Sequence, residues 1–468
     1  MKKTAILAAA FLCAALSSAA QGKSPELKIS DKVLKMWADP VLQEKIALGI
    51  ENNRKGDFYI EFVDAKNKNV KAENVKVNMV SHEFLFGAQI FLLNGFEGEK
   101  ENRLYEENFL KLFNFATLPF YWAGYEQADG VYQFDGEQEG MEFKNLYRRP
   151  PQPKLIEFCK KHGLAMKGHP LSWYLNFYSL PAWLPRDEKV IEKHMCRYID
   201  KIAEKFDADI DIWDVSNEAS DTQDREYNNY QNYFPRDHAY KAFKESARVF
   251  SSSDDFIVNF TTPVWMRVSK YREYAQDYLL ASDLINRGAK VDVIGLQLHF
   301  FDKERRDDLL TGADWTPDSS YDVLDTFARL NRPIHITEIT FPCMDEGEVG
   351  EEKQAFFAEN FYKLWFSHPN VQAITYWHFV DGSAGKEDKY NGGFLRRDFS
   401  KKKAFDILDN LINKVWRTDL AFEEPSSEYH FRCFYGKYKV TFTIGGKTTE
   451  KTVILGTNTK KRAYIRVD

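Results

Sequence analysis

The sequence predicts an α/β protein: an eight-stranded (β/α)8 TIM barrel with a small β-sandwich formed by strands from the N- and C-terminal parts of the chain. Two observations predict this architecture. Between about residues 82 and 415, eight short apolar runs alternate with longer stretches of helical spacing. Segments with a period of two residues flank this region on both sides. At 468 residues, the chain is long enough to bury both cores.

The eight apolar runs have the length of buried β-strands. They cover residues 84–90, 112–118, 164–167, 210–215, 256–260, 291–298, 333–336 and 371–377. Parallel strands of a barrel all end at one rim, where active sites are assembled. We therefore expect the polar residues that close these runs to meet there.

The flanking segments begin with a helix that Asp39 caps and Pro40 opens. Apolar and polar residues then alternate over 58–62 and 75–79, and again over 438–444, after which a Gly-Gly turn leads into a last apolar strand. Each segment alone has too few strands to bury a face. We expect the two segments to pack together as one sandwich that braces the barrel; carbohydrate binding by the sandwich is the alternative.

The first residues have the pattern of a secretory signal peptide. Lys2 and Lys3 precede an apolar run over 5–16, followed by small residues up to position 20. A lipid anchor on Cys13 is the less favoured alternative, because Leu12 stands where such a signal needs a small residue. No later run approaches the roughly 20 apolar residues of a membrane span. We expect an exported protein, periplasmic or extracellular, without a membrane span.

These patterns divide the chain into a signal peptide (1–20), an N-terminal helix and β segment (21–81), the barrel (82–415) and a C-terminal β segment (416–468). The 64 basic and 70 acidic residues nearly balance, which argues against a nucleic-acid partner or an anionic membrane surface. The cysteines after the signal peptide form no C-x-x-C or Cys/His cluster, so we expect isolated buried thiols and no metal site. They are Cys159, Cys196, Cys343 and Cys433.

Two glutamates stand at strand ends, Glu218 after D-I-W-D-V-S-N and Glu338 after P-I-H-I-T. One such glutamate could simply pair with a basic residue. Two such glutamates, with His169, Gln297 and His299 at other strand ends, indicate a catalytic site. Retaining glycoside hydrolysis needs one protonated carboxyl group to donate a proton and one ionised group to attack. No phosphate loop follows the seventh run and no H-x-H pair lies on the first, which argues against phosphate-handling and binuclear-metal enzymes.

Five segments along the barrel carry a family resemblance. In order, M-K-G-H-P-L-S-W, W-D-V-S-N-E, V-I-G-L-Q-L-H, I-T-E and I-T-Y-W-H-F-V-D resemble the strand-end motifs of glycoside hydrolase family 10, the xylanase family. The resemblance covers about residues 82–415. It implies the barrel fold and a secreted enzyme that cleaves β-glycosidic bonds, with endo-1,4-β-xylanase activity as the default.

The resemblance also implies residue roles. Glu218 matches the general acid/base, Glu338 the nucleophile, and His299 the residue that orients the nucleophile. The other matched positions are expected to bind the sugar: His169, Trp173, Asn217, Gln297 and Trp377. Without the resemblance, the histidines and tryptophans would be interpreted as core residues. The implied mechanism is double displacement, with carboxyl groups about 5–5.5 Å apart, a polysaccharide or oligosaccharide substrate, and no metal or organic cofactor.

One motif departs from the family pattern. Where the family has E-N-E-M-K-W to hold the sugar in the −2 subsite, this chain has T-L-P-F-Y-W, so Thr117, Leu118 and Tyr121 replace three polar anchors. Such losses change discrimination strongly. The chain is 15% aromatic, and aromatic faces at a cleft can carry sugar rings. We therefore expect a rebuilt subsite with Phe120 and Tyr121 as walls.

Two further positions also differ from the family: Gly385 stands where a second tryptophan is common, and Tyr174 replaces a histidine. The segment 221–237 forms either a loop over the leaving-group side or a surface insertion. A decorated xylan, another β-linked glycan or a terminal β-glycoside would each fit such a site. A barrel that binds glycans without hydrolysing them is the alternative from another class, although binding alone needs neither glutamate.

Overall fold

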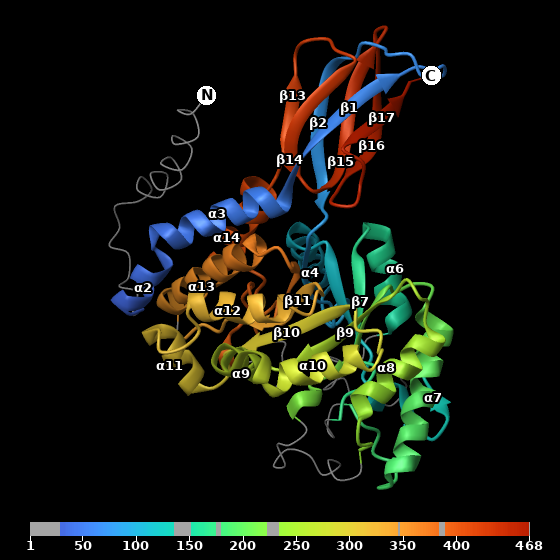
Figure 1. Ribbon diagram of the computed structural model, residues 1–468, viewed down its shortest axis with the longest axis vertical. Coiled ribbons are helices and arrows are strands. Elements are labelled where there is room, and N and C mark those ends of the chain that lie inside the picture. Colours follow the sequence, from blue (N-terminus) through green and yellow to red (C-terminus); the bar gives the residue numbers. More distant parts are fainter. Residues whose placement is uncertain are drawn as a thin grey trace.

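The structure is a computed structural model that describes residues 29–134, 151–174, 179–221, 234–344, 347–382 and 389–467. Figure 1 shows a barrel surrounded by helices, with a sandwich of β-strands standing at one end of it. The predicted signal peptide, Gly385 and most of the segment 221–237 lie outside the described residues.

The core of the molecule is a closed barrel of eight parallel strands, in the order of the chain. Each predicted apolar run overlaps one strand, so the predicted barrel is confirmed. The strands are β3 (Leu85–Gln89), β4 (Phe115–Pro119), β7 (Ala165–His169), β8 (Ile212–Asn217), β9 (Asp255–Phe260), β10 (Val293–His299), β11 (Ile334–Thr340) and β12 (Val371–Tyr376).

Amphipathic helices cover the outside of the barrel. In α7 (Glu188–Phe206), Asp187 caps the first turn, and Ile191, Met195, Tyr198 and Ile202 recur every three or four residues on the buried face. The others are α4 (Glu99–Leu112), α5 (Trp122–Tyr125), α6 (Gln152–His162), α8 (His238–Val249), α9 (Pro263–Tyr271), α10 (Gln276–Asn286), α11 (Lys303–Thr311), α12 (Pro317–Ala328), α13 (Gly347–Ser367) and α14 (Lys403–Asn410). A short hairpin, β5 (Glu126–Ala128) and β6 (Val131–Tyr132), follows α5.

Two helices precede the sandwich, α2 (Asp31–Trp37) and α3 (Pro40–Arg54), and Asp39 caps α3 as predicted. At the end of α3, the buried Arg54 guanidinium donates hydrogen bonds to the carbonyls of Phe366, His368 and Val371, at 2.5, 2.5 and 2.7 Å. These carbonyls lie at and just after the C-terminal end of α13. One buried cation thus ties the N-terminal helix to the barrel.

The sandwich consists of two sheets that combine strands from both ends of the chain. One has the order β14 (Glu428–Phe434), β1 (Lys55–Val63), β17 (Arg462–Arg466). The other has the order β13 (Asp419–Phe422), β2 (Glu73–His82), β15 (Gly436–Ile444), β16 (Lys447–Leu455). Phe62 of β1 contacts Phe442 of β15, with ring centroids 4.7 Å apart, so the two inner faces form one core.

The sandwich lies at the amino-terminal ends of the barrel strands. His82, which closes β2, contacts Phe434 of β14 and Phe86 at the start of β3, with ring centroids 6.1 and 5.4 Å apart. Phe86 in turn stacks on Trp416, just before β13. This face is opposite to the rim where the barrel strands end, and Figure 1 shows the sandwich on that side.

Among the described helices, none is long and apolar enough to cross a bilayer. The four cysteines after residue 28 are free thiols. Cys159 and Cys433 are buried as expected, whereas Cys196 and Cys343 are only partly buried.

Candidate active site

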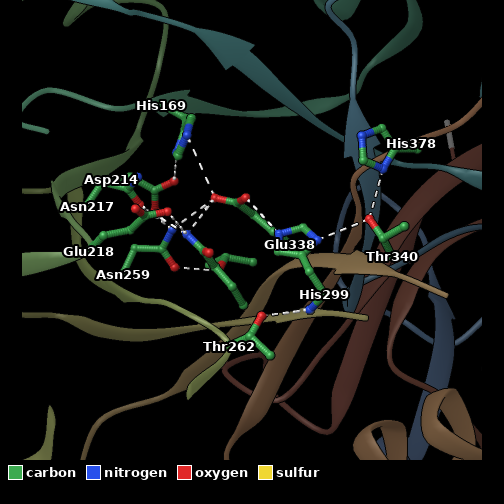
Figure 2. A network of polar contacts seen from close by, with 12 residues as sticks. His169, Asp214, Asn217, Glu218, Asn259, Thr262, His299, Glu338, Thr340 and His378 are labelled. Carbon is green, nitrogen blue, oxygen red and sulfur yellow. Dashed lines mark hydrogen bonds and ion pairs between the residues drawn. The ribbon is translucent and has the colours of Figure 1, made fainter. Parts of the chain in front are cut away.

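The strand ends bring the predicted site residues to one rim of the barrel. His169 closes β7, Asn217 closes β8 directly before Glu218, and Glu338 lies near the end of β11. Gln297 and His299 lie at the end of β10, and Trp377 follows β12. Figure 2 shows Glu218 and Glu338 facing each other within one polar network.

A single amide joins the two carboxylates. Nε2 of Gln297 lies 3.2 Å from Oε1 of Glu218 and 3.1 Å from Oε1 of Glu338. These two oxygen atoms are therefore at most 6.3 Å apart, the sum of the two distances. The same amide nitrogen lies 3.3 Å from Oδ1 of Asn217.

Glu218 occupies an unusual backbone position at the edge of the cleft. Its φ is 60°, in the left-handed region that side chains with a Cβ rarely adopt, and its N–H donates to the carbonyl of Asn259 at 2.8 Å. Oε2 accepts from Nε1–H of Trp173 at 2.9 Å. Burial, and then the negative charge of Glu338, raise the pKa of Glu218 to about 8, although the hydrogen bonds from Gln297 and Trp173 act in the opposite direction.

Glu338 is buried, and side-chain nitrogen atoms contact both of its oxygen atoms. Oε1 accepts from Nδ2 of Asn259 at 3.1 Å and from Gln297. Oε2 contacts Nε2 of His299 at 3.3 Å, and Nε2 of His169 lies 3.7 Å from Oε1. The amides of Asn259 and Gln297 both donate to this carboxyl group.

His169 contacts a buried ion pair formed by Asp214 and Lys167. Oδ2 of Asp214 lies 2.7 Å from Nδ1 of His169 and 2.8 Å from Nζ of Lys167, and all three side chains are almost fully buried. Burial alone would raise the pKa of Asp214, but the positive charge of Lys167 and the hydrogen bond from His169 outweigh it and lower that pKa. The sequence analysis did not identify Lys167 or Asp214.

Asn259 is a second missed residue. Its side chain lies at the end of β9, where Nδ2 donates to Oδ1 of Asn217 at 2.8 Å as well as to Glu338, and Oδ1 accepts from the Thr337 hydroxyl at 2.5 Å. The signal that could have revealed it is a buried amide inside the apolar run F-I-V-N-F. Asn259 fixes the relative positions of β8 and β11 at the rim.

Buried aromatic rings pack around His169 beside the carboxylates. The ring of Tyr121 lies 5.6 Å from His169 and 5.9 Å from Trp173, measured between centroids. Trp377 lies 5.5 Å from His169. Phe91, which the sequence analysis did not single out, contacts both Tyr121 and Trp377. Tyr121 therefore belongs to the same cluster of side chains as the predicted site.

The expectation that Phe120 lines the cleft is wrong. Its ring packs against Phe206 and Trp213, at 5.2 and 5.0 Å, in the layer between the barrel and its helices. Neighbouring residues in an extended chain point to opposite sides, so Phe120 and Tyr121 cannot both face the cleft. Thr117 and Leu118 are fully buried, and within the described part of the chain Oγ1 of Thr117 has no hydrogen-bond partner.

One group of side chains has the spacing of a metal site within the described residues, namely Glu126, Asp129 and His194. The Arg197 guanidinium forms ion pairs with both carboxylates, at 2.6 Å from Asp129 and still closer to Glu126. A cation thus already neutralises this group, which contains none of the cleft residues.

Comparison with known proteins identifies the family. The family described as Glycosyl hydrolase family 10 matches residues 138–410. The anti-sigma-I factor RsgI6 of Acetivibrio thermocellus is 24% identical over 402 residues, which cover 85% of this chain and 46% of that protein. Endo-1,4-beta-xylanase B of Thermotoga neapolitana is 27% identical over 251 residues, which cover 51% of this chain and 65% of that protein. The chain thus spans less than two thirds of either curated relative.

Solved structures agree on the fold. Native xylanase 10B from Thermotoga maritima superposes with a TM-score of 0.57 at 20% sequence identity, over 71% of this chain and 96% of that one. Xylanase 10B from Thermotoga petrophila, in complex with xylobiose, gives a TM-score of 0.56 at the same identity, over 71% and 95%. The family match extends over more than half of the chain, and this chain belongs to glycosyl hydrolase family 10.

Proposed function

We propose that this protein is a retaining glycoside hydrolase that cleaves β-glycosidic bonds in a plant-type polysaccharide, most simply an endo-1,4-β-xylanase. The observation that carries the proposal is the pair Glu218 and Glu338, whose nearest oxygen atoms are at most 6.3 Å apart and whose surroundings differ. A retaining enzyme has carboxyl groups about 5–5.5 Å apart, whereas an inverting enzyme needs about 6.5–9.5 Å to admit a water molecule. The bound of 6.3 Å accommodates the retaining spacing, and membership of the family supports retention.

The different surroundings support an assignment of roles. With a pKa of about 8, Glu218 keeps its proton near neutral pH and can donate it to the leaving-group oxygen. Glu338, held by N–H donors, attacks the anomeric carbon as a carboxylate. The glycosidic C–O bond breaks and a glycosyl-enzyme forms. Glu218, now ionised, then takes a proton from water, whose oxygen attacks the same carbon and releases Glu338.

The identity of the substrate is inferred less directly than the catalytic roles. Relatives named endo-1,4-beta-xylanase support β-1,4-xylan as the default. However, Thr117 and Leu118 are fully buried, and Tyr121, only 1% exposed, packs with its ring 5.9 Å from that of Trp173. We infer that the subsite beyond the −1 sugar is not built for an undecorated xylose. A decorated xylan, another β-linked glycan and a terminal β-glycoside are the substrates to test beside plain xylan.

The deciding experiment measures turnover of aryl β-xylosides and of a panel of polysaccharides, with NMR detection of the first anomer released. We expect the β-anomer first. Glu338→Ala should abolish turnover, and azide should restore it with formation of an α-glycosyl azide. Glu304→Ala, which removes an exposed glutamate from α11, is the matched control and should keep full activity. A fully active Glu338→Ala protein would refute the nucleophile assignment.

A second candidate is a barrel that binds glycans without hydrolysing them. One observation favours a role other than hydrolysis: the relative matched over 402 residues is named as a regulatory factor, an anti-sigma-I factor, and not as an enzyme, whereas the match to xylanase B extends over 251 residues. Titration calorimetry with oligosaccharides separates the two candidates. Binding without turnover of any substrate would establish the second one and refute the first.

Export and domain organisation are further parts of the proposal. The charged and apolar pattern of residues 1–20 supports removal of this segment during export to the periplasm or the medium. We take 82–415 as the catalytic barrel and the flanks 21–81 and 416–468 as the source of the sandwich strands. Mass spectrometry of the secreted protein tests the cleavage position.

A further inference from the structure

A line of hydrogen bonds leads from Glu338 away from the cleft. Oε2 of Glu338 contacts Nε2 of His299 at 3.3 Å, Nδ1 of His299 contacts Oγ1 of Thr340 at 3.1 Å, and the same Oγ1 contacts Nδ1 of His378 at 2.9 Å. Figure 2 shows these four side chains in sequence. All four are buried, with Thr340 fully inaccessible to solvent. Two imidazole rings are thus joined through a single hydroxyl group.

The number of available protons restricts the direction of these bonds. An ionised Glu338 can only accept, so Nε2 of His299 must carry a proton. If His299 is neutral, its Nδ1 is then an acceptor, and Thr340 must donate its only proton to it. The oxygen of Thr340 is left to accept from Nδ1–H of His378. The carboxylate at one end thereby determines the tautomer of both histidines.

The opposite direction requires a positive charge on His299. An imidazolium would donate from Nδ1 to Thr340, and Thr340 would then donate to His378. A positive charge on this ring would lie beside Glu338 and would stabilise the carboxylate that has to attack. The neutral arrangement leaves that carboxylate more reactive.

The surroundings leave Thr340 little freedom to turn. A Cβ added to Gly392 would lie 2.5 Å from Cγ2 of Thr340, so the backbone of this loop packs closely against the threonine methyl group. The buried Gln354 amide holds the loop by donating to the carbonyls of Gly392 and Gly393 at 3.1 Å. The backbone of His299 is held separately, because its N–H donates to Oγ1 of Thr262 at 2.8 Å. Packing therefore aims the Thr340 hydroxyl at both rings.

We propose that Thr340 and His378 are positioning residues that fix His299 as the neutral tautomer protonated on Nε2, which holds Oε2 of Glu338 for attack. This inference rests on the proposed function only in taking Glu338 as the nucleophile. Neither residue touches the substrate in this assignment. Both act through His299.

The first test needs no activity. Protein labelled with ¹⁵N-histidine is studied at pH 7.5 by long-range ¹H–¹⁵N correlation, with the two rings assigned from His299→Gln and His378→Asn. We expect His299 to be protonated on Nε2 alone and His378 to be protonated on Nδ1. A His299 ring protonated on Nδ1, alone or together with Nε2, would overturn the proposal. Because the measurement needs no turnover, it tests the tautomers even if the protein binds glycans without hydrolysing them.

The second test compares matched variants. Thr340→Val removes the hydroxyl at constant shape, and Thr340→Ser keeps it. We expect Thr340→Val to lower kcat about fivefold with little change in KM, and Thr340→Ser to retain activity within about twofold. His378→Asn, whose amide can replace Nδ1–H, should exceed His378→Phe in kcat by a similar factor. Should Thr340→Val leave both kcat and the His299 nitrogen shifts unchanged, the proposal would be wrong. If that variant does not fold, the tautomers of the unaltered protein decide.

Discussion

The high pKa of Glu218 offers a quantitative test of the carboxylate pair. Burial and the charge of Glu338 both raise this pKa, to about 8. The variant Glu338→Gln removes the charge and keeps the shape of the side chain. At an effective dielectric constant of about 20, a unit charge about 6 Å away contributes about 2.8 kcal/mol, or about two pKa units. We therefore expect the pKa of Glu218 to fall to about 6 in Glu338→Gln, and burial accounts for the remaining elevation.

The assay is ¹³C NMR titration of protein labelled at the glutamate carboxyl carbon. The Glu218 signal is identified by its loss in Glu218→Gln, and Glu304→Gln is the control that should leave the titration unchanged. In the unaltered enzyme, kcat/KM should fall as pH rises through about 8, because the proton donor is then lost. If Glu218 still titrates near 8 in Glu338→Gln, the charge coupling inferred from the geometry is absent. A value near 4.5 in the unaltered protein would refute the whole argument.

Three other substitutions test the supports of the site, each by urea denaturation. Because glycine adopts a φ of 60° without a steric cost, Glu218→Gly should be about 1 kcal/mol more stable than Glu218→Ala, and equal stabilities would contradict the strain. Lys167→Met leaves the Asp214 carboxylate buried without its ion pair, which should cost about 3–5 kcal/mol, and adding Asp214→Asn should restore part of this. Arg54→Met removes the donor to three buried carbonyls at the end of α13 and should cost at least about 2 kcal/mol; a loss below about 0.5 kcal/mol would contradict the anchoring role.

The sequence can predict those site residues whose role depends only on their position along one strand. Glu218 and Glu338 were found because a residue that closes a barrel strand must face the rim. Lys167 and Asp214 lie inside strands, where a charged residue resembles a break in the pattern. Only the pairing of β7 with β8 shows that they neutralise each other. Contacts between neighbouring strands depend on register, which the pattern of one segment does not determine.

The same reason explains the other missed residues. Asn259 is one polar residue in an apolar run, and its importance comes from what β8 and β11 place beside it. Thr340 lies just beyond the motif I-T-E, and His378 lies within I-T-Y-W-H-F-V-D without an obvious role. Their side chains meet only because β11 and β12 end side by side at the rim. Alternation along the extended chain already separates Phe120 from Tyr121.

For the sandwich, the sequence predicts that the N- and C-terminal β segments pack together, but not the order of the strands within each sheet. Two short β segments that cannot bury a face alone had to combine, and they do. That β1 lies between β14 and β17, antiparallel to the first and parallel to the second, follows from crossovers that leave no local mark in the sequence.

The central place of β1 has a consequence for synthesis. Both of its neighbours are encoded in the last tenth of the chain, so β1 stays unpaired while the ribosome makes the entire barrel. An early strand with two open edges is prone to join other chains. A chaperone or translocation machinery that keeps the nascent polypeptide extended would suppress such aggregation. The closing of the sandwich would then have to wait until residues 428–466 have been delivered.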